Sequence, residues 1–296
     1  MSAELLHPEL FRQLPFAGYA VQTKLEEAAR EAERQRFSVA EDLSVVVRMR
    51  DSDLHYIDEL FDDIEANEAN YPGHVQKIAV ISGSHELVDK ANDRHFKTMR
   101  LPPKLYTHPM ALNMGFEEAK HRVVLSLVGH SALTNTATFI AATNHTEENF
   151  GAIYSTSLPG RNASWSERLG ALGLRTQRRM TMRPVLVDPK SSEPDKEGFM
   201  AAESVAISRE AWEQAGKFDL SFAAGGESGQ LGRYLQALGY NIYRNSPLAV
   251  FHTHGLDPLQ SWRQAVAWRK MGQPHEFHPT LMSECPEPRP PQEKRK

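Results

Sequence analysis

Apolar runs that alternate with amphipathic segments limit this sequence to few folds. The run at 123–128 (VVLSLV) shows no regular polar alternation, which is typical of a strand covered on both faces. A helical pattern at 112–119 precedes this run, and His130 follows it directly after Gly129. Ligands of open α/β sheets bind at the carboxyl ends of the strands. We therefore expect a polar site near residue 130.

The same alternation occurs earlier in the chain. Residues 43–47 (LSVVV) and 75–81 (VQKIAVI) have the pattern of strands, and residues 53–66 and 86–96 carry apolar side chains at helical spacing. The order strand, helix, strand, helix, strand is typical of a parallel, doubly wound sheet flanked by helices. The predicted fold class is α/β, with a single main domain.

Composition and charge exclude several classes of protein. Hydrophobic residues make up 40% of the 296 residues, which permits a core, and the net charge of −4 gives no electrostatic reason for nucleic-acid binding. No apolar run approaches the roughly 18 residues of a membrane span, and no secretory signal pattern opens the sequence. The single cysteine, Cys285, fits a reducing compartment. These features predict a cytoplasmic protein.

The sequence divides into four segments. Residues 1–40 form a helical extension, whose segment 21–36 reads as an exposed helix or, alternatively, as an oligomer contact. The main domain is predicted at 41–256. Residues 257–283 form a C-terminal helical extension, and residues 284–296, rich in proline and charge, are predicted to be a disordered tail.

Five blocks, in this order and spacing, resemble the family-2 nucleotide-sugar glycosyltransferases. The blocks are LSVVVRMRDSD, ISGSHE, ALNMGFEEAKHRVVLSLVGH, MAAESVAISREAWEQAGKFD and FAAGGESGQLGRYLQALGYNIYRNSPLAVFHTHG. The resemblance implies a GT-A, Rossmann-like fold with a mostly parallel sheet. It also implies a hexosyltransferase-type enzyme, whose partners are a nucleotide-sugar donor and an unidentified hydroxyl acceptor, and which inverts the anomeric carbon. A homo-oligomer is left open.

The resemblance implies a donor site at the ends of the predicted strands. Arg48 and Arg50 end the first strand, although both could equally be solvated charges. The turn that contains Gly83 can present backbone N–H groups to an anion. The family's Asn-x-Gly motif matches Asn113 and Gly115. The residues implied to bind the donor are Arg48, Arg50, Ser82, Gly83, Asn113 and Gly129.

The family's metal motif, Asp-x-Asp, corresponds here to Val128-Gly129-His130. Only its last position can bind a metal, and His254 matches a second metal-binding position of the family. The resemblance therefore implies a divalent metal, Mn²⁺ or Mg²⁺, held by His130 and His254, and imidazole favours Mn²⁺ over Mg²⁺. His252 continues the apolar run at 248–251, which favours a core or solvent-facing position rather than a ligand.

The family's general base is an aspartate in a Gly-Glu-Asp motif, where this chain has Gly226-Glu227-Ser228. A serine hydroxyl is a poor base at neutral pH, so Glu227 is the candidate for the catalytic base. The alternative is that Glu227 only complements the dipole of a helix that begins there.

The usual acidic residues of the family are replaced at three positions, Ile81, Val128 and Ser228. Loss of a general base or of a carboxylate at the metal lowers the rate of glycosyl transfer. Two hypotheses follow. The chain is an active transferase with a rearranged site, or it is a catalytically weak or inactive relative that serves as a binding or partner protein.

Overall fold

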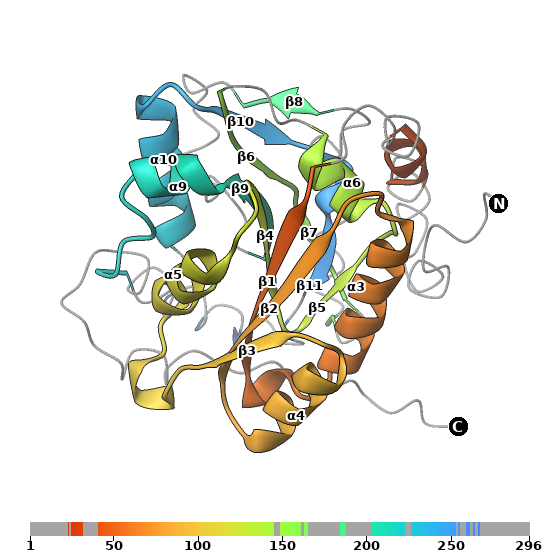
Figure 1. Cartoon of the computed structure of the whole chain (residues 1–296), viewed down its shortest axis with the longest axis vertical. Coiled ribbons are helices and arrows are strands. Elements are labelled where there is room, and N and C mark those ends of the chain that lie inside the picture. The colour runs from red at the N-terminus through yellow and green to blue at the C-terminus, as the bar shows by residue number, and fades with distance from the viewer. Residues whose placement is uncertain are drawn as a thin grey trace.

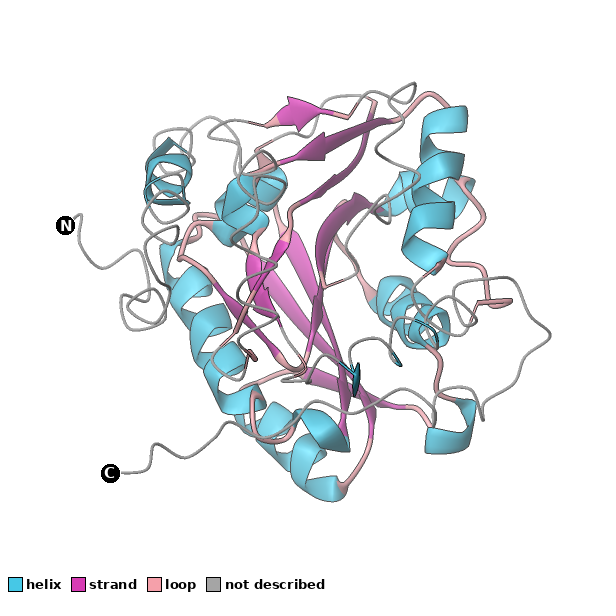
Figure 2. Ribbon diagram, turned by 180° about the vertical axis from the view of Figure 1, so that it is seen from behind, coloured by secondary structure: helices cyan, strands magenta, loops and turns pink. Residues whose placement is uncertain are grey.

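A mixed sheet between two layers of helices makes up the main body of the protein (Figure 1). The computed structural model describes residues 23, 25–31, 41–144, 149–160, 163–164, 184–187, 203–222, 226–252, 254, 259–260, 263 and 266. Seen from behind, helices again flank the strands on both sides (Figure 2).

The main sheet has eight strands. They are β1 (Leu43–Arg50), β2 (Val75–Ser82), β3 (Lys97–Arg100), β4 (Val123–Val128), β6 (Phe150–Tyr154), β8 (Val185–Leu186), β9 (Ser204–Ser208) and β10 (Asn241–Arg244). Their order is β3-β2-β1-β4-β9-β6-β10-β8. β1 pairs in parallel with β2 and β4, so the carboxyl ends of these three strands share one edge. β9 runs antiparallel between β4 and β6.

A second sheet of three strands lies against this edge. It contains β5 (Ser131–Leu133), β11 (Val250–His252) and β7 (Ser157–Leu158), with β11 in the centre. β5 follows β4 after a turn of only two residues, Gly129 and His130. The antiparallel pairing of β11 with β5 therefore brings residues 250–252 next to the end of β4.

The α-helices of the main domain pack in two groups. The helices are α3 (Ile57–Asn70), α4 (His85–Asp93), α5 (His108–Glu118), α6 (Thr138–Thr143), α9 (Arg209–Gln214) and α10 (Glu227–Ala237). Short 3₁₀ turns occur at η1 (Asp51–Asp53), η2 (Pro103–Leu105) and η4 (Ser246–Leu248). α3, α4 and α6 contribute to one hydrophobic cluster, whereas α5, α9 and α10 contribute to a second.

β1 shows why the apolar runs were not alternating. Successive side chains of a strand point to opposite faces of the sheet. Val45 and Val47 belong to the first hydrophobic cluster, and Val46 belongs to the second. All three are fully buried, so β1 is covered on both faces, as its sequence predicts.

The predicted α/β class and the main strands are confirmed. β1 continues beyond the predicted strand 43–47 because Arg48–Arg50 still pair with β2, ending at Arg50 opposite Ser82. The helix predicted from residue 53 begins at Ile57 because η1 occupies the segment directly after β1. Ser208 caps α9, as its side chain accepts a hydrogen bond from the Ala211 N–H at 3.3 Å.

The predicted N-terminal helix is confirmed over its described residues, but it is less exposed than expected. Residues 25–31 are helical, and Leu25, Ala28 and Ala29 are buried. Ala29 belongs to the first hydrophobic cluster, so small side chains let this helix pack closely on the main domain. The predicted tail at 284–296, including Cys285, lies outside the described residues.

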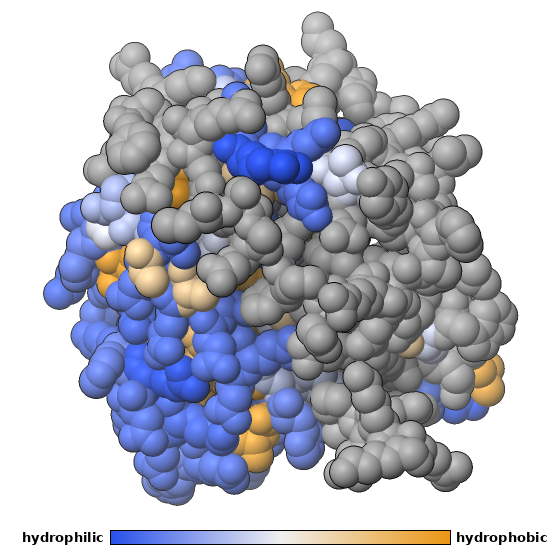
Figure 3. All heavy atoms as spheres, turned by 90° about the vertical axis from the view of Figure 1, so that its right-hand side faces the viewer, coloured by the Kyte–Doolittle hydropathy of each residue, from blue (hydrophilic) through white to orange (hydrophobic). Residues whose placement is uncertain are grey.

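No helix among the described residues is both long enough and apolar enough to cross a membrane. On the face shown in Figure 3, the described residues are mostly hydrophilic, with scattered hydrophobic side chains.

Two residues of α5 fix its position on the sheet. Asn113 lies inside this helix, where its Nδ2 donates to the Phe218 carbonyl at 2.8 Å and its Oδ1 accepts from the Phe218 N–H at 3.0 Å. Gly115 faces β1 so closely that a Cβ there would lie 2.2 Å from Cγ1 of Val46. The Asn113-x-Gly115 motif therefore joins α5 to β1 and to the segment after α9.

This contact predicts a coupled pair of substitutions. G115A should destabilise the protein by about 2–3 kcal/mol, because overpacking displaces α5 or β1. V46A should cost about 2 kcal/mol through lost burial. The double variant should cost little more than V46A alone, since the nearest remaining side-chain atom is Cβ of Val46 at 3.3 Å. Urea unfolding of the four proteins measures this coupling, and strictly additive costs would contradict it.

Candidate functional site

Polar side chains gather where β1, β2 and β4 end, and η1 lies at the centre of this group. A Cβ on Gly83 would come within 2.6 Å of Asp51 Oδ1, and a Cβ on Gly129 within 2.7 Å of Asp53 Oδ2. The turn after β2 and the turn after β4 can therefore approach η1 this closely only because each has a glycine at the contact. The Ser84 N–H donates to Asp51 Oδ1 at 2.6 Å, so the turn after β2 is held by a carboxylate of this chain.

Asp53 organises the turn that carries His130. Its carboxyl group is buried, with 3% of the side chain exposed. Oδ2 accepts from the Arg50 N–H at 2.8 Å, and Oδ1 lies 2.6 Å from Nδ1 of His130. This contact directs Nδ1 of His130 to Asp53 and leaves Nε2 on the side of the ring that faces His252.

Three imidazoles meet at this point. Nε2 of His252 lies 2.9 Å from Nε2 of His130, and His254 packs against both rings, with centroids 5.0 and 5.1 Å away. The pairing of β11 with β5 explains the contact, because His252 lies opposite Ser131, the residue after His130. A ligand atom from each of the three histidines lies within 4.8 Å of the others.

This arrangement could hold a metal ion. Two nitrogens that are each about 2.1 Å from one ion, at an angle near 90°, lie about 3 Å apart, close to the spacing of His130 and His252. The contact of His130 with Asp53 also matches the carboxylate that commonly orients a metal-binding histidine. The group therefore combines a set of three nitrogen ligands with a support for the first of them.

A second buried group lies beside the histidines. Glu227 is the first residue of α10 and is fully buried, and its Oε1 lies 3.7 Å from Nδ1 of His108 at the start of α5. Among the described residues, neither carboxylate oxygen of Glu227 has a hydrogen-bond partner. The ring of His108 lies edge-on to Tyr106, with centroids 6.0 Å apart, and Arg50 lies 5.5 Å above the Tyr106 ring.

Arg48 connects the two groups electrostatically. It is 3% exposed, and its carbonyl accepts the Gly129 N–H at 2.9 Å. Burial lowers the pKa of His108 to about 4, and the Arg48 charge acts in the same direction. Burial also lowers the pKa of His252 well below its ordinary value, with His130, His254 and Arg48 adding to the effect. Both imidazoles are therefore neutral at pH 7.

Arg48 also lowers the pKa of Glu227, but for a carboxyl group a lower pKa favours the charged form. Burial would raise the pKa of this carboxyl group, but the ring nitrogen of His108, 3.7 Å from Oε1, and the charge of Arg48 outweigh burial and lower the pKa from its ordinary value. Glu227 is therefore an anion at neutral pH. A buried carboxylate without a hydrogen-bond partner can accept a hydrogen bond from a bound ligand.

Two solved structures share this architecture. The mannosyltransferase PcManGT from Pyrobaculum calidifontis, in complex with GDP-Man and Mn²⁺, matches with a TM-score of 0.51 and 14% identity, over 85% of this chain and 71% of its own. TarS from S. aureus matches with a TM-score of 0.51 and 15% identity, over 82% of this chain and 42% of its own. The chain has the GT-A fold. No protein-family model and no curated protein matches it.

Within this GT-A fold, most residues predicted for the site lie at the carboxyl edge of β1, β2 and β4. Arg48 and Gly129 are joined by a backbone hydrogen bond, and His130 follows directly. Arg50 lies opposite the buried Ser82 at the ends of β1 and β2. Of the remaining predicted residues, Gly83 packs against η1, His254 belongs to the histidine group and Glu227 lies beside His108.

Asn113 lies apart from these residues in its contacts. Both polar atoms of its amide are occupied by the Phe218 backbone, at 2.8 and 3.0 Å. The side chain therefore holds two segments of the GT-A fold together, and its predicted role in donor binding stays a prediction.

Sequence reasoning missed three residues of the site. Asp53 follows the polar end of β1, and its position in RMRDSD was the only available signal. His108 was assigned no role, although it begins α5, the helix that carries the Asn-x-Gly motif. His252 was favoured as a core or solvent-facing residue, whereas it lies in contact with His130.

The neutral state of His108 predicts a pH dependence of stability. A histidine whose folded pKa lies near 4, against 6.5 ordinarily, binds fewer protons in the folded state between these values, so stability falls as the pH falls from 6.5 to 4. H108Q should make this fall shallower by about 2–3 kcal/mol, while His252 maintains part of the slope.

Urea unfolding at pH 7 and at pH 4.5 measures this difference. H85Q, at an exposed histidine of α4, is the matched control. An H108Q slope identical to that of the wild type would show that His108 is not held neutral in the folded protein.

Proposed function

We propose that this chain is a glycosyltransferase that moves a sugar from a nucleotide-sugar donor to a hydroxyl acceptor, with inversion at the anomeric carbon. The observation that carries the proposal is one shared location. Three histidines, the buried Arg48 and the carboxylate of Glu227 all lie at the edge of the sheet where ligands of α/β folds bind. PcManGT, which has the same fold, was solved with GDP-Man and Mn²⁺.

The metal in this proposal is a divalent transition metal ion such as Mn²⁺ rather than Mg²⁺. Mg²⁺ prefers oxygen ligands in octahedral geometry, whereas the available set is His130, His252 and His254. A bound ion would neutralise charge on the diphosphate leaving group. Asp53 contributes by holding His130 in the tautomer that offers Nε2.

Glu227 is the general base in this proposal. Its carboxylate is ionised at neutral pH, and it would accept the proton of the attacking hydroxyl as that oxygen bonds to the anomeric carbon and the bond to the diphosphate breaks. Among the described residues neither oxygen has a hydrogen-bond partner, and Nδ1 of His108 lies 3.7 Å from Oε1, which leaves both oxygens able to accept a hydrogen bond. His108, being neutral, does not neutralise this base at pH 7.

The arginines have separate roles. Arg48 is buried, so we assign it the task of keeping Glu227 ionised and of supplying positive potential beneath the diphosphate. Arg50 is partly exposed and lies over the ring of Tyr106, which suits a direct contact with the donor.

The competing proposal is a nucleotide-sugar-binding protein with little or no turnover. It is favoured by Ser228, which is buried, stands where the family has its base, and has no hydrogen-bond partner for its hydroxyl among the described residues. In that case the donor binds without being consumed. Donor binding and donor turnover must therefore be measured separately.

Turnover of the donor tests the role of Glu227. We expect wild-type protein with Mn²⁺ to release nucleoside diphosphate from at least one common nucleotide sugar, with water as the acceptor. E227Q should lower this rate by about 10²–10⁴-fold, because an amide cannot take the proton. Donor affinity measured by calorimetry should stay within a few-fold of the wild type.

E210Q is the matched control, since Glu210 is an exposed glutamate in the first turn of α9. Wild-type binding of a donor without measurable turnover would favour the binding protein. Absence of binding to every common nucleotide sugar and nucleoside diphosphate, with and without Mn²⁺, would contradict both proposals.

The metal assignment predicts a specific effect of Asp53. D53N should raise the Mn²⁺ concentration needed for half-maximal donor turnover by about 10–100-fold, because His130 loses the carboxylate that orients it. D58N, at an exposed carboxylate of α3 that pairs with Lys90, should leave it unchanged. Equal Mn²⁺ dependence in D53N and the wild type would remove His130 from the metal site.

A further inference from the structure

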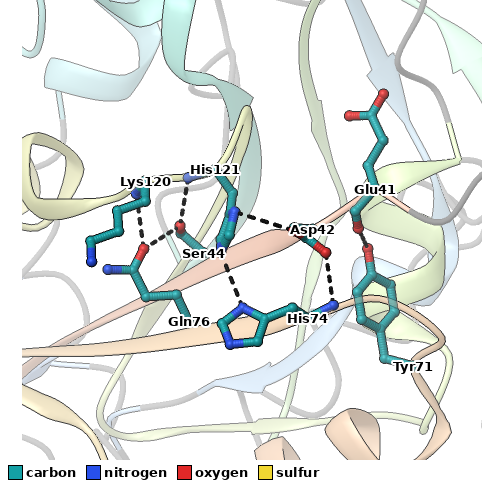
Figure 4. Close-up of polar contacts among 8 residues, drawn as sticks. All are labelled: Glu41, Asp42, Ser44, Tyr71, His74, Gln76, Lys120 and His121. Carbon is teal, nitrogen blue, oxygen red and sulfur yellow. Dashed lines mark hydrogen bonds and ion pairs between the residues drawn. The ribbon is translucent and has the colours of Figure 1, made fainter.

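A second group of histidines lies at the opposite edge of the sheet, remote from the site described above. Asp42, His74 and His121 come just before β1, β2 and β4, respectively. Leu43 is paired with both Val75 and Val123, so the amino ends of the three strands lie level. The parallel pairing therefore brings these three side chains together, as Figure 4 shows.

The two imidazoles face each other through their nitrogens. Nδ1 of His74 lies 3.3 Å from Nε2 of His121, and the ring planes are inclined by 64°. The other ring nitrogen of His121, Nδ1, lies 3.8 Å from Oδ2 of Asp42. Oδ1 of the same carboxylate accepts the His74 N–H at 2.9 Å, so Asp42 contacts both histidines (Figure 4).

Hydrogen bonds to the side chains of Ser44 and Gln76 fix the turn that carries His121. Its N–H donates to Oγ of Ser44 at 3.2 Å, and Ser44 donates to Oε1 of Gln76 at 2.8 Å. The Lys120 N–H donates to the same Oε1 at 2.9 Å. Ser44 is fully buried in β1, so the backbone on both sides of the histidine pair is held in place.

We propose that His74 and His121 bind a divalent transition metal ion of the zinc class, with water completing the coordination. Two nitrogens about 2.05 Å from a tetrahedral ion lie about 3.3 Å apart, which is the spacing that these imidazoles have. Imidazole is a preferred ligand of zinc, copper and nickel. Asp42 lies in the second coordination shell, where its carboxylate, 3.8 Å from the other nitrogen of His121, favours a cation electrostatically.

The site has a structural consequence. The ion connects the segment before β2 to the segment before β4, across the amino end of β1. Because the ion binds the folded chain, where the two histidines are already adjacent, it raises the unfolding temperature with its concentration. This site shares no residue with the group of His130, His252 and His254, so the proposal and its test do not depend on the proposed glycosyl transfer.

Zn²⁺ titration of the full-length chain by calorimetry tests the proposal. H74Q and H121Q should each remove one equivalent of bound Zn²⁺, or weaken that equivalent at least tenfold, and should abolish its contribution to thermal stability. D42N should weaken it by about tenfold. The matched control, H85Q, removes an exposed histidine elsewhere on the surface and should leave the titration unchanged.

The H130Q/H252Q double variant separates the two metal sites. It should lose a different equivalent and keep the one that depends on His74. The same Zn²⁺ stoichiometry and affinity in wild type, H74Q and H121Q would overturn the proposal and leave the pair as an imidazole–imidazole hydrogen bond. Because His74 is exposed and the two variants are independent, a folding defect in one does not prevent the test.

Discussion

The contact between Asp53 and His130 determines the shape of the carboxyl edge of this fold. A buried carboxylate is costly unless hydrogen bonds satisfy it, and here the Arg50 N–H and the His130 imidazole supply them. These two hydrogen bonds hold η1 against the turn after β4, which leaves no room for a side chain at residue 129. The same contact orients His130 towards His252. The end of β1, the turn after β4 and β11 therefore depend on one ionisable pair.

The fold could be predicted because its signals are local. The apolar runs of β1, β2 and β4 reflect burial on both faces, which each strand carries in its own sequence. Element ends were less predictable, because the extension of β1 to Arg50 depends on pairing with β2, which its own residues do not reveal. The N-terminal helix was predicted, but its packing on the main domain was underestimated, since alanines in an otherwise charged segment give a weak apolar stripe.

The site was predictable only where a family pattern marked it. His130 and Glu227 occupy positions that the resemblance singles out, but their partners do not. Asp53 reaches His130 across 77 positions of sequence, and His252 reaches it across 122. These contacts arise from the register of strands that pair at long range, so neither periodicity nor spacing contains them.

The replaced acids of the family motifs are consistent with this different set of partners. Val128 at the end of β4 and Ile81 in β2 are buried aliphatic residues, so neither side chain has an atom that could bind a metal or a nucleotide hydroxyl group. The histidines of β11 and of the turn after β4 could supply nitrogen ligands instead, which carry no negative charge. With the neutral imidazole of His252 near the buried Arg48, the local potential is more positive than a pair of carboxylates would allow, and this favours the diphosphate of the proposed donor. In the proposed metal site, the change from carboxylate to imidazole would leave more positive charge at the ion and beside Arg48 than the carboxylates of the family motif would.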